Sequence, residues 1–87
     1  MKTYNENWLG ISDRAKDLER ARQSFIEEFE AVNWYQQRIE LTDDHELRKI
    51  LEHNRDEEKE HAALLFEYIK KHDPAQAKAL ENSDFGK

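Results

Sequence analysis

Residues 53–63 read His-Asn-Arg-Asp-Glu-Glu-Lys-Glu-His-Ala-Ala and contain the pair Glu58 and His61. Three residues are about one helical turn, so on a helix this carboxylate and imidazole lie on one face and reach toward a common point. At about 100° per residue, the neighbours of Glu58 on that face are mostly apolar. They are Leu47, Leu51, Asn54, Arg55, Ala62, Leu65, Ile69 and His72. The pair therefore lies in a stripe that should face a core, where a carboxylate needs a compensating partner.

A second carboxylate occupies the same kind of stripe earlier in the chain. Glu28 is predicted to share a helix face with Ala21, Ser24, Phe25, Ala31, Val32, Tyr35 and Ile39. Glu-x-x-His is the ligand motif of ferritin-like di-iron carboxylate proteins, which take a further Glu from each of two other helices. The spacing alone is a weak signal. Because the Glu58 and His61 pair lies in the middle of an apolar stripe, we favour metal binding as its role.

The fold class predicted is all-α, with long helices, because the two Gly and the single Pro lie outside residues 13–73. We expect a helix over about 13–40, with Ser12 as its N-cap, and a second over about 44–72. Asp43 and Glu46 resemble a capping box at the start of the second helix. A short third helix over about 74–81 is expected after Asp73-Pro74. The short break near Asp43 predicts an antiparallel two-helix hairpin, and residues 1–87 are interpreted as one ferritin-like half-domain.

Composition and charge restrict the kinds of molecule that this chain can bind. The 14 Lys and Arg against 20 Asp and Glu leave a formal charge of −6, which argues against nucleic acid and favours cations. No cysteine is present, which excludes disulfides, iron–sulfur clusters and thiol catalysis. No apolar run reaches the ~20 residues of a membrane span, and the first ten residues lack a signal-peptide layout. We therefore expect a soluble, cytoplasmic protein without membrane partners.

A single chain has too few apolar residues for a full core and too few ligands for a di-iron centre. Hydrophobic residues make up 37% of the chain, below the ~45–50% usual for globular domains even when glycine is counted. One copy offers Glu28, Glu58 and His61, which is half of a di-iron ligand set. The sequence therefore predicts a homodimer that forms a four-helix bundle, with metal on its two-fold axis. Carboxylate and imidazole donors suit iron or manganese and also accept zinc.

Each of these assignments has a structural alternative. Glu58 and His61 can form a buried hydrogen bond between helices, and Glu28 can pair with Arg14 or Arg55. Tyr35 can orient a ligand or donate an electron, or it can be an aromatic core residue with a solvated hydroxyl. A separate face carries Glu27, Glu30 and Trp34, which are either a solvated surface or a patch that attracts cations.

Residues 27–35 and 53–63 together resemble the encapsulated ferritin family, and the similarity runs from about residue 25 to residue 73. The resemblance implies a ferroxidase with a di-iron centre between two subunits, bridged by Glu58 of each chain. Glu28 and His61 would be its terminal ligands, and Tyr35 would lie beside the centre. The resemblance also implies an outer site for Ca²⁺ or another divalent cation, formed by Glu27, Glu30 and Trp34.

The resemblance extends to assembly and location. It implies a decamer built as five dimers, carried inside an encapsulin shell, where iron is stored as mineral in a cytoplasmic nanocompartment. Family members carry a C-terminal segment that targets the shell, and residues 84–87 show no recognisable peptide of that kind.

The function predicted is oxidation of Fe²⁺ to Fe³⁺ by O₂ or peroxide. The main alternative is a non-catalytic helical hairpin that dimerises, or acts as an adaptor, with Glu58 and His61 as a buried polar pair. A third possibility is peroxide reduction of the rubrerythrin type, for which this cysteine-free chain would need an external electron donor.

Overall fold

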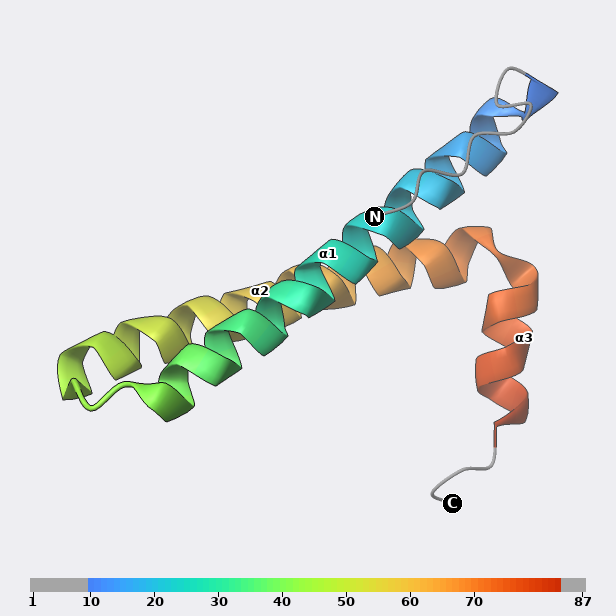
Figure 1. Cartoon of the computed structure of the whole chain (residues 1–87). Coiled ribbons are helices and arrows are strands. Elements are labelled where there is room, and N and C mark those ends of the chain that lie inside the picture. Colours follow the sequence, from blue (N-terminus) through green and yellow to red (C-terminus); the bar gives the residue numbers. More distant parts are fainter. Residues whose placement is uncertain (1–9, 84–87) are drawn as a thin grey trace.

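The structure, a computed structural model, describes residues 10–83, and the C-terminal residues 84–87 considered above lie outside this range. Its described part consists of three helices: α1 over Asp13–Leu41, α2 over His45–His72 and α3 over Pro74–Asn82. The all-α class predicted from the sequence is confirmed. α1 and α2 lie side by side as an antiparallel hairpin, and α3 turns away from its open end (Figure 1).

The helices start at short polar side chains that accept hydrogen bonds from free backbone N–H groups. Ser12 caps α1 by accepting from the Ala15 amide at 3.1 Å, as the sequence predicts. The prediction for α2 was wrong by one position: its N-cap is Asp44, whose Oδ1 accepts from the Leu47 amide at 2.9 Å. Because the N-cap is Asp44 and not Asp43, a capping box between Asp43 and Glu46 does not form.

The contact between α1 and α2 contains few large side chains. The buried apolar residues among those described are Ala21, Ile39, Leu51, Ala62 and Ile69, two of which are alanines. Phe25 adds a ring contact to Phe66, with centroids 5.4 Å apart. The radius of gyration is 16.7 Å, whereas about 12 Å is expected for a globular domain of this length. The hairpin is therefore a thin layer with its core exposed along one edge.

The junction between α2 and α3 is organised by Asp73. This residue ends α2, and its carboxylate also caps α3 by accepting from the Gln76 amide at 3.2 Å. Its second oxygen accepts from Arg22 of α1 at 2.9 Å. Pro74 occupies the first turn of α3, where a missing N–H does no harm. Asp73 thus connects all three helices.

Much apolar surface remains in contact with solvent. The accessible surface of 7208 Å² exceeds the roughly 5400 Å² expected for a folded monomer of this size. One side of the hairpin, called here the open face, runs along α2 on the His61 side of Glu58. It carries Leu47, Ile50, Leu64 and Tyr68, which are between 40% and 71% exposed. None of the helices within residues 10–83 has the length and apolarity that a bilayer crossing requires.

Candidate metal centre

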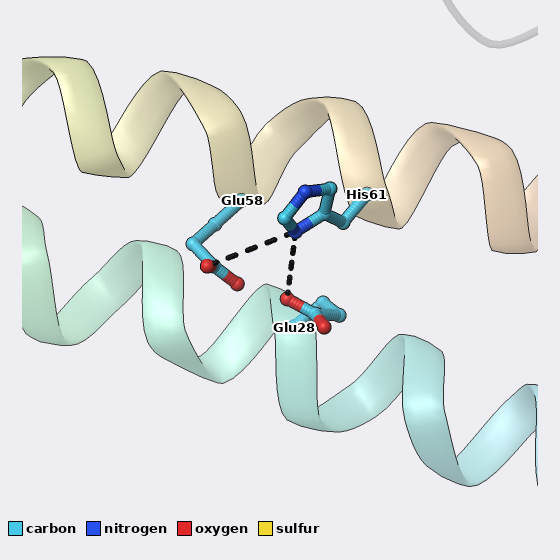
Figure 2. Close-up of side chains that lie close together, drawn as sticks. All are labelled: Glu28, Glu58 and His61. Atoms are coloured by element: carbon cyan, nitrogen blue, oxygen red, sulfur yellow. Dashed lines mark ion pairs between the residues drawn. The ribbon is translucent and has the colours of Figure 1, made fainter.

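Glu28, Glu58 and His61 converge at the middle of the hairpin. Glu28 projects from α1, whereas Glu58 and His61 project from successive turns of α2 toward it (Figure 2). His61 Nδ1 lies 3.6 Å from Glu28 Oε2 and 3.8 Å from Glu58 Oε1. One ligand atom from each of the three residues lies within 4.8 Å of the others. The structure therefore brings together the three residues for which the sequence predicts metal binding.

Local sequence explains how the two helices approach at this level. Ala62, directly after His61, is only 3% exposed, so a small side chain occupies the helix contact at this level. Small side chains at a helix contact permit a short interaxial distance, so that polar side chains beside the contact can meet. The three-residue spacing then places Glu58 and His61 on one flank of α2, facing Glu28.

The centre lies at the edge of the hairpin and is not enclosed by it. The side chains of Glu58, Glu28 and His61 are 21%, 32% and 51% exposed, respectively. The sequence pattern placed them inside a core-facing stripe. The two helices cover only part of that stripe. The rest of it, including half of the His61 side chain, is exposed in a single chain.

The two carboxylates at the centre influence each other's protonation. The pKa of Glu58 is raised above its ordinary value of 4.5, mainly because its carboxyl group shares a hydrogen bond with Glu28. Partial burial and the negative charge of Glu28 raise the pKa further, while the imidazole of His61 acts in the opposite direction. A cation bound between the carboxylates would compensate the negative charges of both.

The spacing of the donor atoms suits a metal ion. The two His61 contacts, at 3.6 and 3.8 Å, are too long for good hydrogen bonds. Ligand atoms that surround one ion at about 2.0–2.2 Å are themselves about 3–4 Å apart. Two carboxylates and one imidazole, without sulfur, form a donor set that iron and manganese accept and that zinc also tolerates.

The other residues selected from the sequence lie outside this group. Tyr35 follows Glu28 by two helical turns, or about 10 Å along α1, and its half-buried ring contacts the Arg38 guanidinium at 5.8 Å. Glu27 and Glu30 are exposed, and Glu27 accepts a hydrogen bond from Gln23 at 3.2 Å. Within residues 10–83, neither belongs to a set of side chains close enough to hold an ion.

Trp34 is 52% exposed, and it borders a surface hollow with Gln37, Arg38 and Leu41. Glu30 borders a different hollow, which is formed with Phe25, Ile26, Phe29 and Asn33. Within one chain, the structure therefore does not bring the residues of the expected outer site together. That site stays a prediction.

Sequence reasoning missed the polar contacts that tie the helices together around the centre. Arg55 was considered as a partner of Glu28, but it donates to Gln36 at 2.9 Å and to Asp56 at 3.0 Å. The pairing of Arg22 with Asp73 was also missed. For Arg22 and Asp73, the opposite charges are a signal in the sequence, but using it requires the axial register of the two helices. For Arg55 and Gln36 there is no such signal, because Gln36 is uncharged.

Comparison with known proteins gives consistent matches. The model of the EncFtn-like family matches residues 3–87. A Thermotoga maritima protein named "Ferritin-like protein" is 48% identical over 77 residues, covering 88% of this chain and 68% of the relative. An "Encapsulated ferritin-like protein" of Rhodospirillum rubrum is 46% identical over 70 residues, covering 80% of this chain and 50% of the relative.

Two further matches concern a cargo protein and a solved structure. The "Encapsulin nanocompartment cargo protein EncC" of Myxococcus xanthus is 48% identical over 50 residues, which are 58% of this chain and 38% of that protein. The crystal structure of protein ne0167 from Nitrosomonas europaea superposes with a TM-score of 0.88 at 48% identity, covering 99% of this chain and 94% of the other. The chain spans half or less of the length of two of the three curated relatives.

Proposed function

Because the chain belongs to the EncFtn-like family, we propose that it binds iron at Glu28, Glu58 and His61 and oxidises Fe²⁺ to Fe³⁺ there. One observation carries this proposal: donor atoms from two helices, of the types that iron accepts, lie within 4.8 Å of one another. An iron-storage role is also what the names of the ferritin-like relatives support.

The centre is completed by a second copy of the chain. A single copy provides three ligands on an exposed edge, and two copies related by a two-fold axis provide six. The two Glu28 and two Glu58 carboxylates then carry four negative charges, which balance the four positive charges of two Fe²⁺ ions. Burying the open face in this dimer also removes apolar surface from water.

The ligands favour oxidation through their charge. Hard, anionic carboxylate oxygens stabilise Fe³⁺ more than Fe²⁺, so a site rich in glutamate lowers the free energy of the oxidised ion. Each Fe²⁺ loses one electron to O₂ or peroxide.

The product requires a place to accumulate. Two helices and a short third one enclose no volume in which Fe³⁺ mineral could grow. Two relatives are named as encapsulated or as encapsulin cargo. We therefore propose that this chain, too, works inside an encapsulin shell in the cytoplasm, as dimers that associate further into a ring of five.

The proposal is tested by stopped-flow absorbance at ~300–400 nm after Fe²⁺ is mixed with protein in air. Glu58→Ala and His61→Ala are expected to slow the fast phase by at least 10-fold, since each removes a ligand. Glu60→Ala is the matched control, because this exposed glutamate lies on the same helix outside the ligand group. Wild-type rates in both ligand variants would refute the assignment and favour the non-catalytic hairpin.

A further inference from the structure

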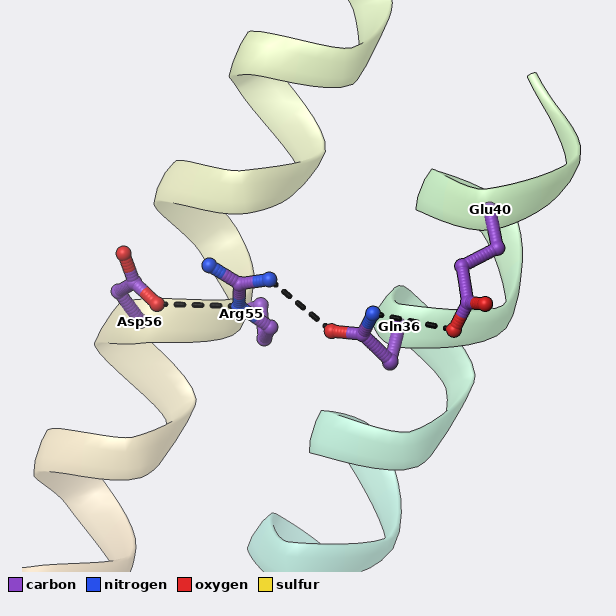
Figure 3. Close-up of polar contacts among 4 residues, drawn as sticks. All are labelled: Gln36, Glu40, Arg55 and Asp56. Carbon is purple, nitrogen blue, oxygen red and sulfur yellow. Dashed lines mark hydrogen bonds and ion pairs between the residues drawn. The ribbon is translucent and has the colours of Figure 1, made fainter.

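A chain of polar contacts crosses from α1 to α2 one turn away from Glu58 (Figure 3). Arg55 Nη1 donates to Gln36 Oε1 at 2.9 Å, and Arg55 Nε donates to Asp56 Oδ1 at 3.0 Å. On α1, Gln36 Nε2 donates to Glu40 Oε2 at 3.1 Å. Both ends of the Gln36 amide therefore have a partner of the right polarity, and its oxygen is held facing Arg55.

This contact lies beside the metal ligands without being one of them. Arg55 precedes Glu58 by three residues, and Gln36 follows Glu28 by eight, or about 12 Å along α1. The Arg55 side chain is 20% exposed. Arg55 and His61 are six residues apart, so they lie on different flanks of α2, about 120° from each other. Arg55 reaches across to Gln36 of α1 (Figure 3), whereas the His61 side chain is 51% exposed.

Apart from the bond between Arg22 and Asp73 at the open end of the hairpin, the rest of the helix contact specifies axial register weakly. Its buried side chains are aliphatic and few, and apolar contacts have no preferred direction. The ring contact of Phe25 with Phe66, with centroids 5.4 Å apart, lies on the other side of the centre. A shift of one residue displaces a helix by about 1.5 Å, enough to separate Glu28 from His61. A hydrogen bond weakens steeply when it is misaligned, so it resists such a shift.

We propose that Arg55 is a positioning residue, whose hydrogen bond to Gln36 fixes the axial register of α1 against α2 and so keeps Glu28 in reach of the ion held by Glu58 and His61. This inference rests on the proposed function, since register matters here through the metal. It adds a second pair of residues, neither of them a ligand, on which metal affinity depends.

The test uses Co²⁺ as the probe, because its visible absorption reports both the affinity and the ligand geometry. Arg55→Met removes the donor but keeps an unbranched apolar stem, and Gln36→Leu removes the acceptor. Each is expected to raise the Kd for Co²⁺ by about 10-fold, the lower end of the effect of residues that support metal ligands, and to change the absorption bands. The double variant is expected to bind Co²⁺ no more weakly than either single variant, because the two substitutions remove the same hydrogen bond.

Two further variants separate positioning from general stability. Arg22→Met breaks the other cross-helix bond, to Asp73, and is expected to lower Tm while leaving the Co²⁺ affinity and spectrum unchanged. Gln36→Glu combined with Glu40→Gln keeps the net charge and allows both hydrogen bonds again. This combination is expected to restore affinity to within about twofold of wild type, since partners and geometry are retained.

The possible results separate this inference from the proposed function. Failure of the wild type to bind Co²⁺ at the three ligands would overturn both. If the wild type binds Co²⁺ and Arg55→Met and Gln36→Leu bind it with the same affinity and spectrum, the positioning role alone is overturned. It is also overturned if Arg22→Met loses as much Co²⁺ affinity as these two variants. All titrations are made at a temperature where circular dichroism shows full helicity, and Gln36→Leu keeps a strong helix former at its position.

Discussion

At the residue scale, the centre depends on two glutamates that are too close together to be both charged without compensation. Glu28 and Glu58 share a hydrogen bond that raises the pKa of Glu58, and His61 Nδ1 lies beside both carboxylates. A raised pKa means that Glu58 takes up a proton more readily in the folded chain than in the unfolded one. A bound cation favours the charged carboxylates, so metal binding opposes that uptake.

This link has a measurable pH dependence in metal-free protein. A carboxyl group whose pKa is raised by folding contributes stability below its unfolded pKa, here about 4.5, and loses that contribution as pH rises through the raised value. Glu58→Gln has no such proton to lose. Urea unfolding in the presence of a chelator should therefore show the variant gaining stability relative to wild type as pH rises from 4 to 7. A difference that stays constant with pH would contradict the coupling of Glu58 to Glu28.

The residues of the centre could be selected from the sequence because helical phase depends only on spacing along the chain. Glu28, Glu58 and His61 are the residues that the structure brings together. Their partial exposure, and the bond between Arg55 and Gln36, could not be derived in this way. Both depend on how far one helix is shifted along the other, which spacing within a helix does not determine.

At the scale of elements, capping side chains determine where the helices begin. The sequence predicted helices over about 13–40, 44–72 and 74–81, and the structure has them over 13–41, 45–72 and 74–82. Adjacent aspartates made the start of α2 ambiguous: both Asp43 and Asp44 are suitable caps, and the structure uses Asp44. Asp73 has more than a capping role, since it also accepts from Arg22.

The role of Asp73 predicts a loss of stability in acid. Its pKa is lowered below the ordinary 3.8, first by the hydrogen bond from Arg22 and then by the Gln76 amide. A lowered pKa gives stability that is present above 3.8 and disappears as pH falls through the folded value. Asp73→Asn keeps a capping side chain but loses the ion pair.

Urea unfolding is expected to show this variant less stable than wild type at pH 6, with the difference shrinking toward pH 2–3. An equal difference at every pH would exclude the ion pair with Arg22 as its source.

At the scale of the whole molecule, one chain leaves a large surface exposed. Its accessible surface exceeds that expected of a monomer by more than the ~800 Å² per partner of a standard interface. Leu64 is 71% exposed and lies one turn beyond His61 on the open face. The exposed half of the centre and the exposed apolar side chains therefore face the same way.

A charge on the open face should therefore prevent assembly. Leu64→Glu is expected to reduce self-association in light scattering coupled to size exclusion, and to slow iron oxidation with it, because the ligand set stays incomplete. Leu80→Glu is the control, since this exposed leucine lies on α3, away from the hairpin centre. An assembly of unchanged mass in Leu64→Glu would show that this face is not the interface.

The central claim, that Glu28, Glu58 and His61 hold iron between two copies of the chain, is tested most directly by anomalous scattering at the iron edge from a crystal grown with Fe²⁺. The account predicts iron within about 2.0–2.2 Å of these side chains, on or beside a two-fold axis that relates two chains. Iron bound elsewhere, with these three residues free of metal, would contradict it.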